Sequence, residues 1–223
     1  MGQVGVYTSA SYRVRTLMRE SAVAVVQFCP GTDREANFRK AGELLREAAR
    51  RGATLAVLPE MFSCLAPATK WRGISERAGG PTEAFLAAAA VEHHLQIVGG
   101  SYIEDAGDGR YFNTCAVIAE DGDIAARYRK MHLFWTEIPG ATRYDERSYL
   151  SAGDKQAVFD AGGFRVSVGI CYDLRFPEFF RLPGGAPADV FCLPAAFMHT
   201  TGTAHWEVLV RSRAIENLAY FAA

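Results

Sequence analysis

Two apolar runs with one amphipathic segment between them constrain the fold more than any other feature of the sequence. Residues 22–28 (AVAVVQF) and 54–58 (TLAVL) are short and apolar, which is typical of buried strands. Between them, Thr32 and Glu35 have the spacing of a capping box and predict a helix, which Gly52 ends. One face of this helix carries apolar residues: Phe38, Ala41, Leu45 and Ala48. A strand–helix–strand order joins parallel strands, so we predict an α/β fold with a helix-covered sheet.

The remainder of the chain continues to alternate strands and helices. The acidic turn at 120–122 (EDG) lies between two apolar runs and predicts an antiparallel hairpin, and residues 160–163 (DAGG) predict a second one. The other predicted elements are a helix over 82–94, a strand over 96–101, a long functional loop over 129–151, a short helix after Cys171 that Pro183 ends, a strand over 189–193, a helix over 204–217 with Thr203 as N-cap, and an apolar run from Tyr220. Two β-rich halves with helices between them predict a layered sandwich.

Composition excludes several classes of function. Hydrophobic residues make up 49% of the 223-residue chain, which is enough for the core of one folded domain. The net charge of -1 offers no basic surplus for nucleic acid, and no stretch is long and apolar enough to span a membrane. Five cysteines without CxxC spacing favour a reducing compartment, so we expect a cytoplasmic protein. The five histidines lack metal-ligand spacing, so no metal is expected.

The first twenty residues differ from the remainder in composition. They contain several arginines, serines and threonines and no acidic residue before Glu20, a weak likeness to a transit peptide. Met18, just before the first predicted strand, is an alternative start. We therefore divide the chain into an N-terminal extension at residues 1–20, for which disorder is one interpretation, and one domain at residues 21–223.

Three reactive side chains each follow the end of a predicted strand. Glu60, Lys130 and Cys171 would converge at one crevice if their strands share a sheet. A carboxylate can take the thiol proton, and an ammonium can stabilise the charge that develops on a carbonyl oxygen. Each residue also has an ordinary interpretation: a carboxylate at a helix start, a solvated lysine and a core cysteine.

The residues around these side chains carry a family resemblance. The sequences LPE at 58–60, YRKMHL at 128–133 and GICYDLRFPE at 169–178 are similar to the three motifs of the nitrilase, or carbon–nitrogen hydrolase, superfamily. The resemblance extends from about residue 22 to the end of the chain. It implies an α-β-β-α sandwich whose helical faces pair into a homodimer or a higher homo-oligomer.

The resemblance also implies a role for each motif residue. Glu60 matches the general base, Lys130 the oxyanion-stabilising lysine and Cys171 the nucleophile. The backbone N–H of Tyr172 would complete the oxyanion hole with Lys130. Glu146 matches a second glutamate of the family, and its ordinary interpretation is a surface charge beside Arg143 and Arg147. The implied reaction passes through a thioester, releases ammonia from a small amide and requires no cofactor.

A narrower resemblance concerns the substrate. Residues 194–197 (PAAF), 200–202 (TTG) and 204–207 (AHWE) resemble the branch of omega-amidases and deaminated-glutathione amidases, whose substrates carry a free carboxylate. Arg175 could bind that carboxylate, with Phe197 and Thr201 in the same pocket. The structural alternative for Arg175 is an ion pair with Asp173 or Glu178.

Other functions stay open at this point. The same three residues would serve an N-carbamoyl amino acid amidohydrolase or a nitrilase, and a cysteine–histidine hydrolase could use His132, His199 or His205. Two departures from the family also matter. Residues 182–187 (LPGGAP) replace the second half of a family helix, and family members commonly have further strands past residue 223. A truncated, non-catalytic binding relative is therefore a second class of hypothesis.

Overall fold

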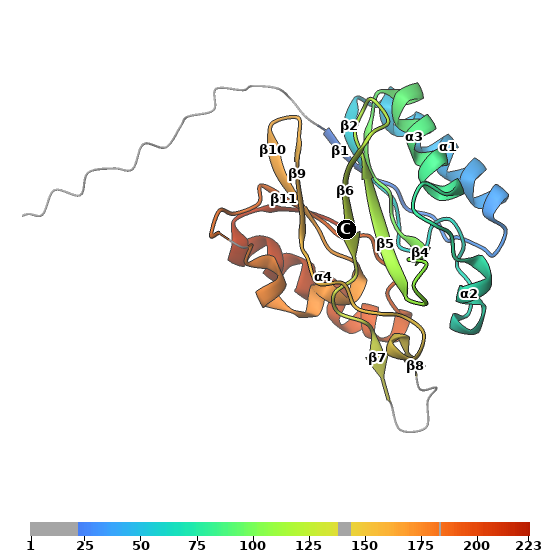
Figure 1. Ribbon diagram of the computed structural model, residues 1–223. Helices are drawn as coiled ribbons and strands as arrows, with labels where there is room; N and C mark the ends of the chain where they lie inside the picture. Colours follow the sequence, from blue (N-terminus) through green and yellow to red (C-terminus); the bar gives the residue numbers. More distant parts are fainter. Residues whose placement is uncertain (1–21, 138–143, 183) are drawn as a thin grey trace, which may run out of the picture.

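The structure is a computed structural model and describes residues 22–137, 144–182 and 184–223 (Figure 1). In this part of the chain, two β-sheets lie face to face, with α1 and α3 on one outer side and α4 on the other (Figure 1). This arrangement is the predicted α-β-β-α sandwich. The extension predicted for residues 1–20 lies outside the described residues.

The first sheet has six strands in the order β1-β2-β3-β5-β4, and β6 also pairs with β5. Its strands are β1 (Ala22–Val25), β2 (Ala53–Val57), β3 (Gln96–Val98), β4 (Tyr102–Asp105), β5 (Tyr111–Ile118) and β6 (Ile124–Arg129). β1, β2 and β3 are parallel, whereas β5 runs antiparallel to β3, β4 and β6. The predicted change from parallel to antiparallel pairing is confirmed.

Both faces of the central strands β2, β3 and β5 are buried, which explains why these strands have apolar runs rather than alternating polarity. Along β2, Leu55 and Val57 face the core between the two sheets, while Ala56 faces the helices. Along β5, Val117 faces the second sheet and Ile118 the helices. Because side chains alternate along a strand, the same strand contributes residues both to the core between the sheets and to the core under the helices.

The second sheet has four strands in the order β12-β11-β10-β9. They are β9 (Ala157–Ala161), β10 (Phe164–Val168), β11 (Val190–Cys192) and β12 (Tyr220–Ala222). The predicted hairpin of β9 and β10 is confirmed, and β10, β11 and β12 are parallel. α4 (His199–Asn217) packs Trp206, Leu209 and Val210 against this side of the core. Within the predicted loop 129–151, β7 (Trp135–Thr136) and β8 (Tyr144–Asp145) form a small ribbon.

Two predicted helix starts are wrong. α1 (Arg34–Arg50) is capped by Asp33, whose side chain accepts from Ala36 N at 3.1 Å, rather than by Thr32. α4 begins at His199, five residues before the predicted residue 204, although the threonines and glycine there have low helix propensity. The hydroxyl of Thr203 therefore donates to the His199 carbonyl inside the helix, at 2.9 Å. α3 (Pro81–His93) lies where it was predicted.

The single helix predicted after Cys171 is also wrong. The structure has two one-turn 3₁₀ helices, Cys171–Arg175 and Pro177–Phe180. Pro177 disfavours a helical conformation at the residue before it, and Phe176 is extended, with φ -110° and ψ 95°. The remaining short helices are Ala68–Lys70, α2 (Trp71–Ile74) and Glu146–Ser148.

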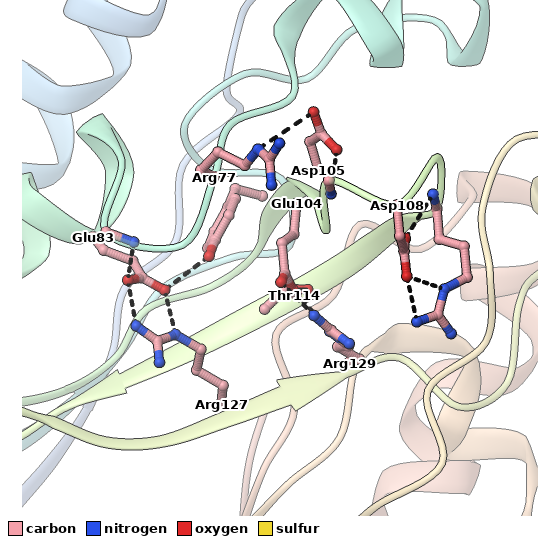
Figure 2. Close-up of polar contacts among 12 residues, drawn as sticks. Arg77, Glu83, Glu104, Asp105, Asp108, Thr114, Arg127 and Arg129 are labelled. Atoms are coloured by element: carbon pink, nitrogen blue, oxygen red, sulfur yellow. Dashed lines mark hydrogen bonds and ion pairs between the residues drawn. The ribbon is translucent and has the colours of Figure 1, made fainter.

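Successive residues at the end of β6 point to opposite faces of the first sheet. Arg127 binds Glu83 of α3 through two hydrogen bonds of 2.8 Å, and Arg129 binds Glu104 of β4 in the same two-pronged manner (Figure 2). Tyr128 points the other way, into the core between the sheets. β6 thus places Arg127 and Arg129 on one face of the sheet and Tyr128 on the face that lies toward the second sheet.

Candidate active site

A cavity of about 310 Å³ opens between the two sheets. Its wall contains all of the predicted site residues: Glu60, Lys130, Glu146, Cys171, Tyr172, Arg175, Phe197 and Thr201. The remaining wall residues are mostly apolar or aromatic: Met61, Leu65, Ala66, Trp71, Asn113, Phe134, Tyr144, Ala196 and Met198. A small apolar pocket with a few convergent polar groups is the usual form of a ligand site.

The three reactive residues come from strand ends of both sheets. Glu60 follows β2 and Lys130 follows β6, and these strands run in the same direction because β5 is antiparallel to both β3 and β6. Cys171 follows β10 of the second sheet. The three strands therefore do not share one sheet, which was the condition given for convergence. The residues meet because the two sheets face each other.

The turn that carries Glu60 is fixed by close backbone contacts. Gly100 has φ +57°, and a Cβ on it would lie 2.2 Å from the Pro59 carbonyl oxygen, so this position requires glycine. On the other side of the turn, Met61 N donates to the Ser101 hydroxyl at 2.9 Å. These contacts place the Glu60 side chain, which is buried, at the cavity wall.

Both carboxylate oxygens of Glu60 accept hydrogen bonds. Oε1 accepts from Asn113 Nδ2 at 2.9 Å and from Lys130 Nζ at 3.0 Å. Oε2 accepts from the backbone N–H of Ala196 at 2.9 Å. Donors on three separate segments therefore fix the orientation of this carboxylate.

Lys130 lies between two carboxylates. Its Nζ is 3.0 Å from Glu60 Oε1 and 3.1 Å from Glu146, and the side chain is 1% exposed. Burial alone would lower the pKa of Lys130, but Glu60 and Glu146 outweigh it and hold this pKa well above its usual value. Lys130 is therefore a permanent cation in the cavity wall.

Glu146 is buried, so its interpretation as a surface charge is wrong. Its Oε2 accepts from Phe134 N at 2.7 Å, which anchors the carboxylate in addition to the contact with Lys130. Burial raises the pKa of Glu146, and only part of this effect is offset by Lys130. Its neighbour Tyr144 lines the same wall, and burial together with the carboxylate of Glu146 raises the pKa of the phenol.

Cys171 occupies a strained turn. Its φ is +45°, a left-handed conformation that costs a residue with a side chain about 1 kcal/mol or more. Its N–H donates to the Pro194 carbonyl at 2.9 Å, which attaches the turn to the end of β11. Burial and the nearby Glu60 carboxylate raise the pKa of the thiol well above its usual value, although Lys130 opposes them. At neutral pH the thiol is therefore protonated, with a carboxylate beside it.

Arg175 is half-buried and lines the same cavity. Its guanidinium is 5.1 Å from the centre of the Phe197 ring, and its two terminal nitrogens lie 3.3 and 3.4 Å from His205 Nδ1. The proposed ion pairs with Asp173 or Glu178 do not form within the described segments, because Asp173 contacts His132 instead. Thr201 contributes to the same wall from the first turn of α4. The guanidinium can therefore donate hydrogen bonds to a carboxylate in the cavity.

Three wall groups were missed by the sequence analysis. Asn113 is a polar residue inside the buried strand β5, and this interruption of an apolar run was an available signal. Tyr144 lies in the segment that looked irregular in the sequence. Ala196 acts through its backbone N–H, for which no side-chain pattern exists.

Two kinds of feature are absent from the described residues. No group of three or more His, Cys, Asp or Glu side chains among them could hold a metal ion. The same residues include no helix that is long and apolar enough to cross a membrane. Of the histidines considered for a cysteine–histidine pair, His199 and His205 are exposed and His132 contacts Asp173.

Comparison with known proteins agrees with the fold. A sequence model of the carbon-nitrogen hydrolase family matches residues 22–223. The chain therefore belongs to the carbon–nitrogen hydrolase family, and the predicted class of enzyme is confirmed. The match begins one residue after the predicted boundary of the domain.

Proteins similar to this chain include omega-amidases and a yeast member of the nitrilase superfamily. The chain is 38% identical over 205 residues to omega-amidase NIT2-B of Xenopus laevis and to omega-amidase NIT2 of Homo sapiens, covering 92% of this chain and 74% of each relative. The crystal structure of Saccharomyces cerevisiae Nit3, a member of branch 10 of the nitrilase superfamily, is similar with a TM-score of 0.79 and 33% identity, covering 89% of this chain and 73% of Nit3. A Nesterenkonia amidase, at 23% identity and a TM-score of 0.76, supports the fold alone.

Proposed function

We propose that this enzyme hydrolyses a small carboxylate-bearing amide and releases ammonia through a thioester on Cys171. The observation that carries the proposal is the arrangement of Glu60, Lys130 and Cys171 in the wall of one cavity. Similarity to proteins described as omega-amidases supports the amide as substrate. The alternatives, an N-carbamoyl amino acid amidohydrolase or a nitrilase, would use the same three side chains.

The first half of the proposed reaction forms the thioester. The resting thiol is neutral, so Glu60 takes its proton as the sulfur–carbon bond forms. The charge that develops on the carbonyl oxygen is stabilised by the Lys130 ammonium and the Tyr172 N–H. When the intermediate collapses, the carbon–nitrogen bond breaks and Glu60 returns the proton to the departing ammonia.

The second half releases the acid. Glu60 takes a proton from a water molecule as that water attacks the thioester carbon, and the same oxyanion groups stabilise the second tetrahedral intermediate. Its collapse breaks the carbon–sulfur bond, and the proton on Glu60 returns to the sulfur. Glu146 takes part by holding the Lys130 ammonium through the 3.1 Å contact. These steps need no metal or organic cofactor.

Arg175 supplies the substrate preference in this proposal. A guanidinium can bind a carboxylate through two parallel hydrogen bonds, and Arg175 lines the same cavity as Cys171, which suits an amide that also carries a carboxylate. Phe197 lies against the guanidinium, and Thr201 lines the wall nearby. We expect Arg175→Ala to raise KM for omega-amides of dicarboxylic acids at least about tenfold. Turnover of an uncharged amide should change little, and an equal change for both substrates would contradict this role.

Ammonia release from omega-amides, N-carbamoyl amino acids and nitriles tests the reaction. The wild-type protein should prefer omega-amides, and mass spectrometry should detect an acyl adduct on Cys171. The Cys171→Ala variant should fold, form no adduct and release no ammonia. Folded wild-type protein that shows neither turnover nor adduct would instead indicate a non-catalytic binding relative. The homo-oligomer and the cytoplasmic location stay predictions, which light scattering and cell fractionation can test.

A further inference from the structure

Asp173 is a fully buried carboxylate to which the proposed reaction assigns no role. Its Oδ2 accepts from Ile170 N at 2.8 Å and from the Tyr128 hydroxyl at 2.6 Å. Its Oδ1 accepts from His132 N at 3.1 Å, and His132 Nδ1 lies 2.7 Å from the same oxygen. The cost of burying a carboxylate is several kcal/mol unless hydrogen bonds compensate it, so these contacts explain how the carboxylate is tolerated.

These contacts join the two segments that carry the reacting groups. Tyr128 and His132 stand two residues before and two residues after Lys130. Ile170 stands one residue before Cys171, and Asp173 two residues after it. Since Lys130 follows the first sheet and Cys171 the second, the carboxylate links the two sheets at the cavity.

Two further contacts strengthen this connection. The Tyr128 hydroxyl, which donates to Asp173, also accepts from Met131 N at 3.0 Å, directly beside Lys130. The His132 ring stacks on Phe176 with centroids 3.8 Å apart and an interplanar angle of 11°. The segment after Lys130 thus packs along the segment after Cys171, with Asp173 at the centre of the contact.

We propose that Asp173 is a positioning residue that fixes the Lys130 ammonium relative to the Cys171 thiol. The assignment of what those two groups do rests on the proposed function, but the connection itself rests on the contacts of Asp173. Displacing a reacting group by about 1 Å can cost up to about a hundredfold in rate. Asp173 therefore acts on the chemical step through Tyr128 and His132, without touching the substrate.

Two tyrosines in the chain provide a matched test. Tyr128 and Tyr102 are 0% and 1% exposed, and each hydroxyl donates to a buried carboxylate, Asp173 at 2.6 Å and Glu83 at 2.8 Å. Tyr128→Phe and Tyr102→Phe remove the same group from equally buried sites, so both should lower the melting temperature. Only Tyr102 lies outside the Asp173 contacts. It is therefore the control for a purely structural effect.

Tyr128→Phe should lower kcat for an omega-amide at least about tenfold with KM within about twofold, because the reacting groups shift while the carboxylate-binding part of the cavity does not. Tyr102→Phe should leave kcat within about twofold of the wild type. Asp173→Asn should show the same split as Tyr128→Phe, and more strongly, if it folds. An unchanged kcat in Tyr128→Phe, or an equal loss in both tyrosine variants, would overturn the proposal.

Alkylation of Cys171 by iodoacetamide separates this proposal from the proposed function, because it needs no amide substrate. The Lys130 ammonium favours the Cys171 thiolate, so its displacement in Tyr128→Phe should slow alkylation at fixed pH relative to both wild type and Tyr102→Phe. If the wild type hydrolyses no amide but alkylation slows in this way, the proposed function fails and the positioning role stands. If the wild type hydrolyses amides and both tyrosine variants are alkylated at the wild-type rate, the positioning role fails.

Discussion

Two groups of buried charges flank the end of β6, and they differ in how their charges balance. On one face of the first sheet, Glu83 and Glu104 each have an arginine of their own (Figure 2). Burial alone would raise the pKa values of these carboxyls, but hydrogen bonds from Arg127 and Arg129 outweigh it and lower them. In the cavity, a single lysine serves two carboxylates and a thiol.

The comparison shows that burial by itself does not distinguish a functional charge from a structural one. Glu104 and Glu146 are 4% and 5% exposed, yet the pKa of Glu104 is lowered and that of Glu146 is raised. The difference is the number of cations for each carboxylate. Where several acidic groups share one cation, some of them can hold a proton and transfer it. A two-pronged arginine pair instead holds its carboxylate in the ionised form.

Lys130→Met should have the largest effect of the substitutions, because it should lower both kcat and stability. In the proposed reaction Lys130 is an oxyanion donor, and loss of such a donor costs about 10² to 10³ in kcat. Two buried carboxylates would also lose their cation, a change that destabilises proteins by about 3–5 kcal/mol. Ammonia-release kinetics and urea unfolding measure both effects. The control Arg127→Met removes a cation from Glu83 and should lower stability while kcat stays within about twofold. Loss of activity in both variants would mean that the comparison does not hold.

Two carboxylate variants should separate the effect on stability from the effect on kcat. Glu104→Gln cannot accept both arginine hydrogen bonds and should cost about 3 kcal/mol of stability with little change in kcat. Glu146→Gln removes a carboxylate whose ionisation is unfavourable in the fold, so stability should stay within about 1 kcal/mol. Its kcat should fall about tenfold or more, because Lys130 loses an anchor. Urea unfolding and steady-state kinetics of the two purified variants test this separation.

The smallest expected effect is a difference in pH dependence. The folded-state pKa of Glu104 is lowered, so its stabilising contribution is present above the unfolded pKa of about 4.3 and is lost as pH falls. The folded-state pKa of Glu146 is raised, so its contribution is present below that value and is lost as pH rises through the folded pKa. Unfolding free energies between about pH 3 and pH 8 should therefore show the cost of Glu104→Gln shrinking in acid. Over the same range, the unfolding free energy of Glu146→Gln should increase relative to that of the wild type as pH rises. Parallel profiles for the two variants would contradict the opposite pKa shifts of Glu104 and Glu146.

Local patterns predicted most of the fold. The apolar runs of β2, β5 and β10 and the turns at 120–122 and 160–163 were sufficient, because the strand period and turn chemistry are local properties. The start of α4 was not predictable in this way, since Thr200, Thr201 and Gly202 are poor helix formers that nevertheless lie within the helix. The break at Pro177 was visible in the sequence, but its effect on Phe176 was overlooked.

The predicted site residues line one cavity, although their strands belong to two different sheets. Strand ends located Glu60, Lys130 and Cys171, whereas the sequence does not state which sheet each strand joins. Partners that act through backbone groups, such as Ala196 N, leave no pattern in the sequence. Asn113 was detectable in principle, because a polar side chain inside a buried strand needs a hydrogen-bond partner.

The alternation along β6 has a consequence for changes in chain length. Inserting or deleting one residue in β6 would turn each side chain downstream within the strand to the opposite face, since the period of a strand is two residues. Arginines would then enter the space between the sheets, and Tyr128 would leave it. Insertions and deletions should therefore be tolerated in the turn at 120–122, where the backbone is exposed, and not between residues 124 and 130. Natural or engineered changes in the length of this hairpin should therefore occur in the turn and not in the strand.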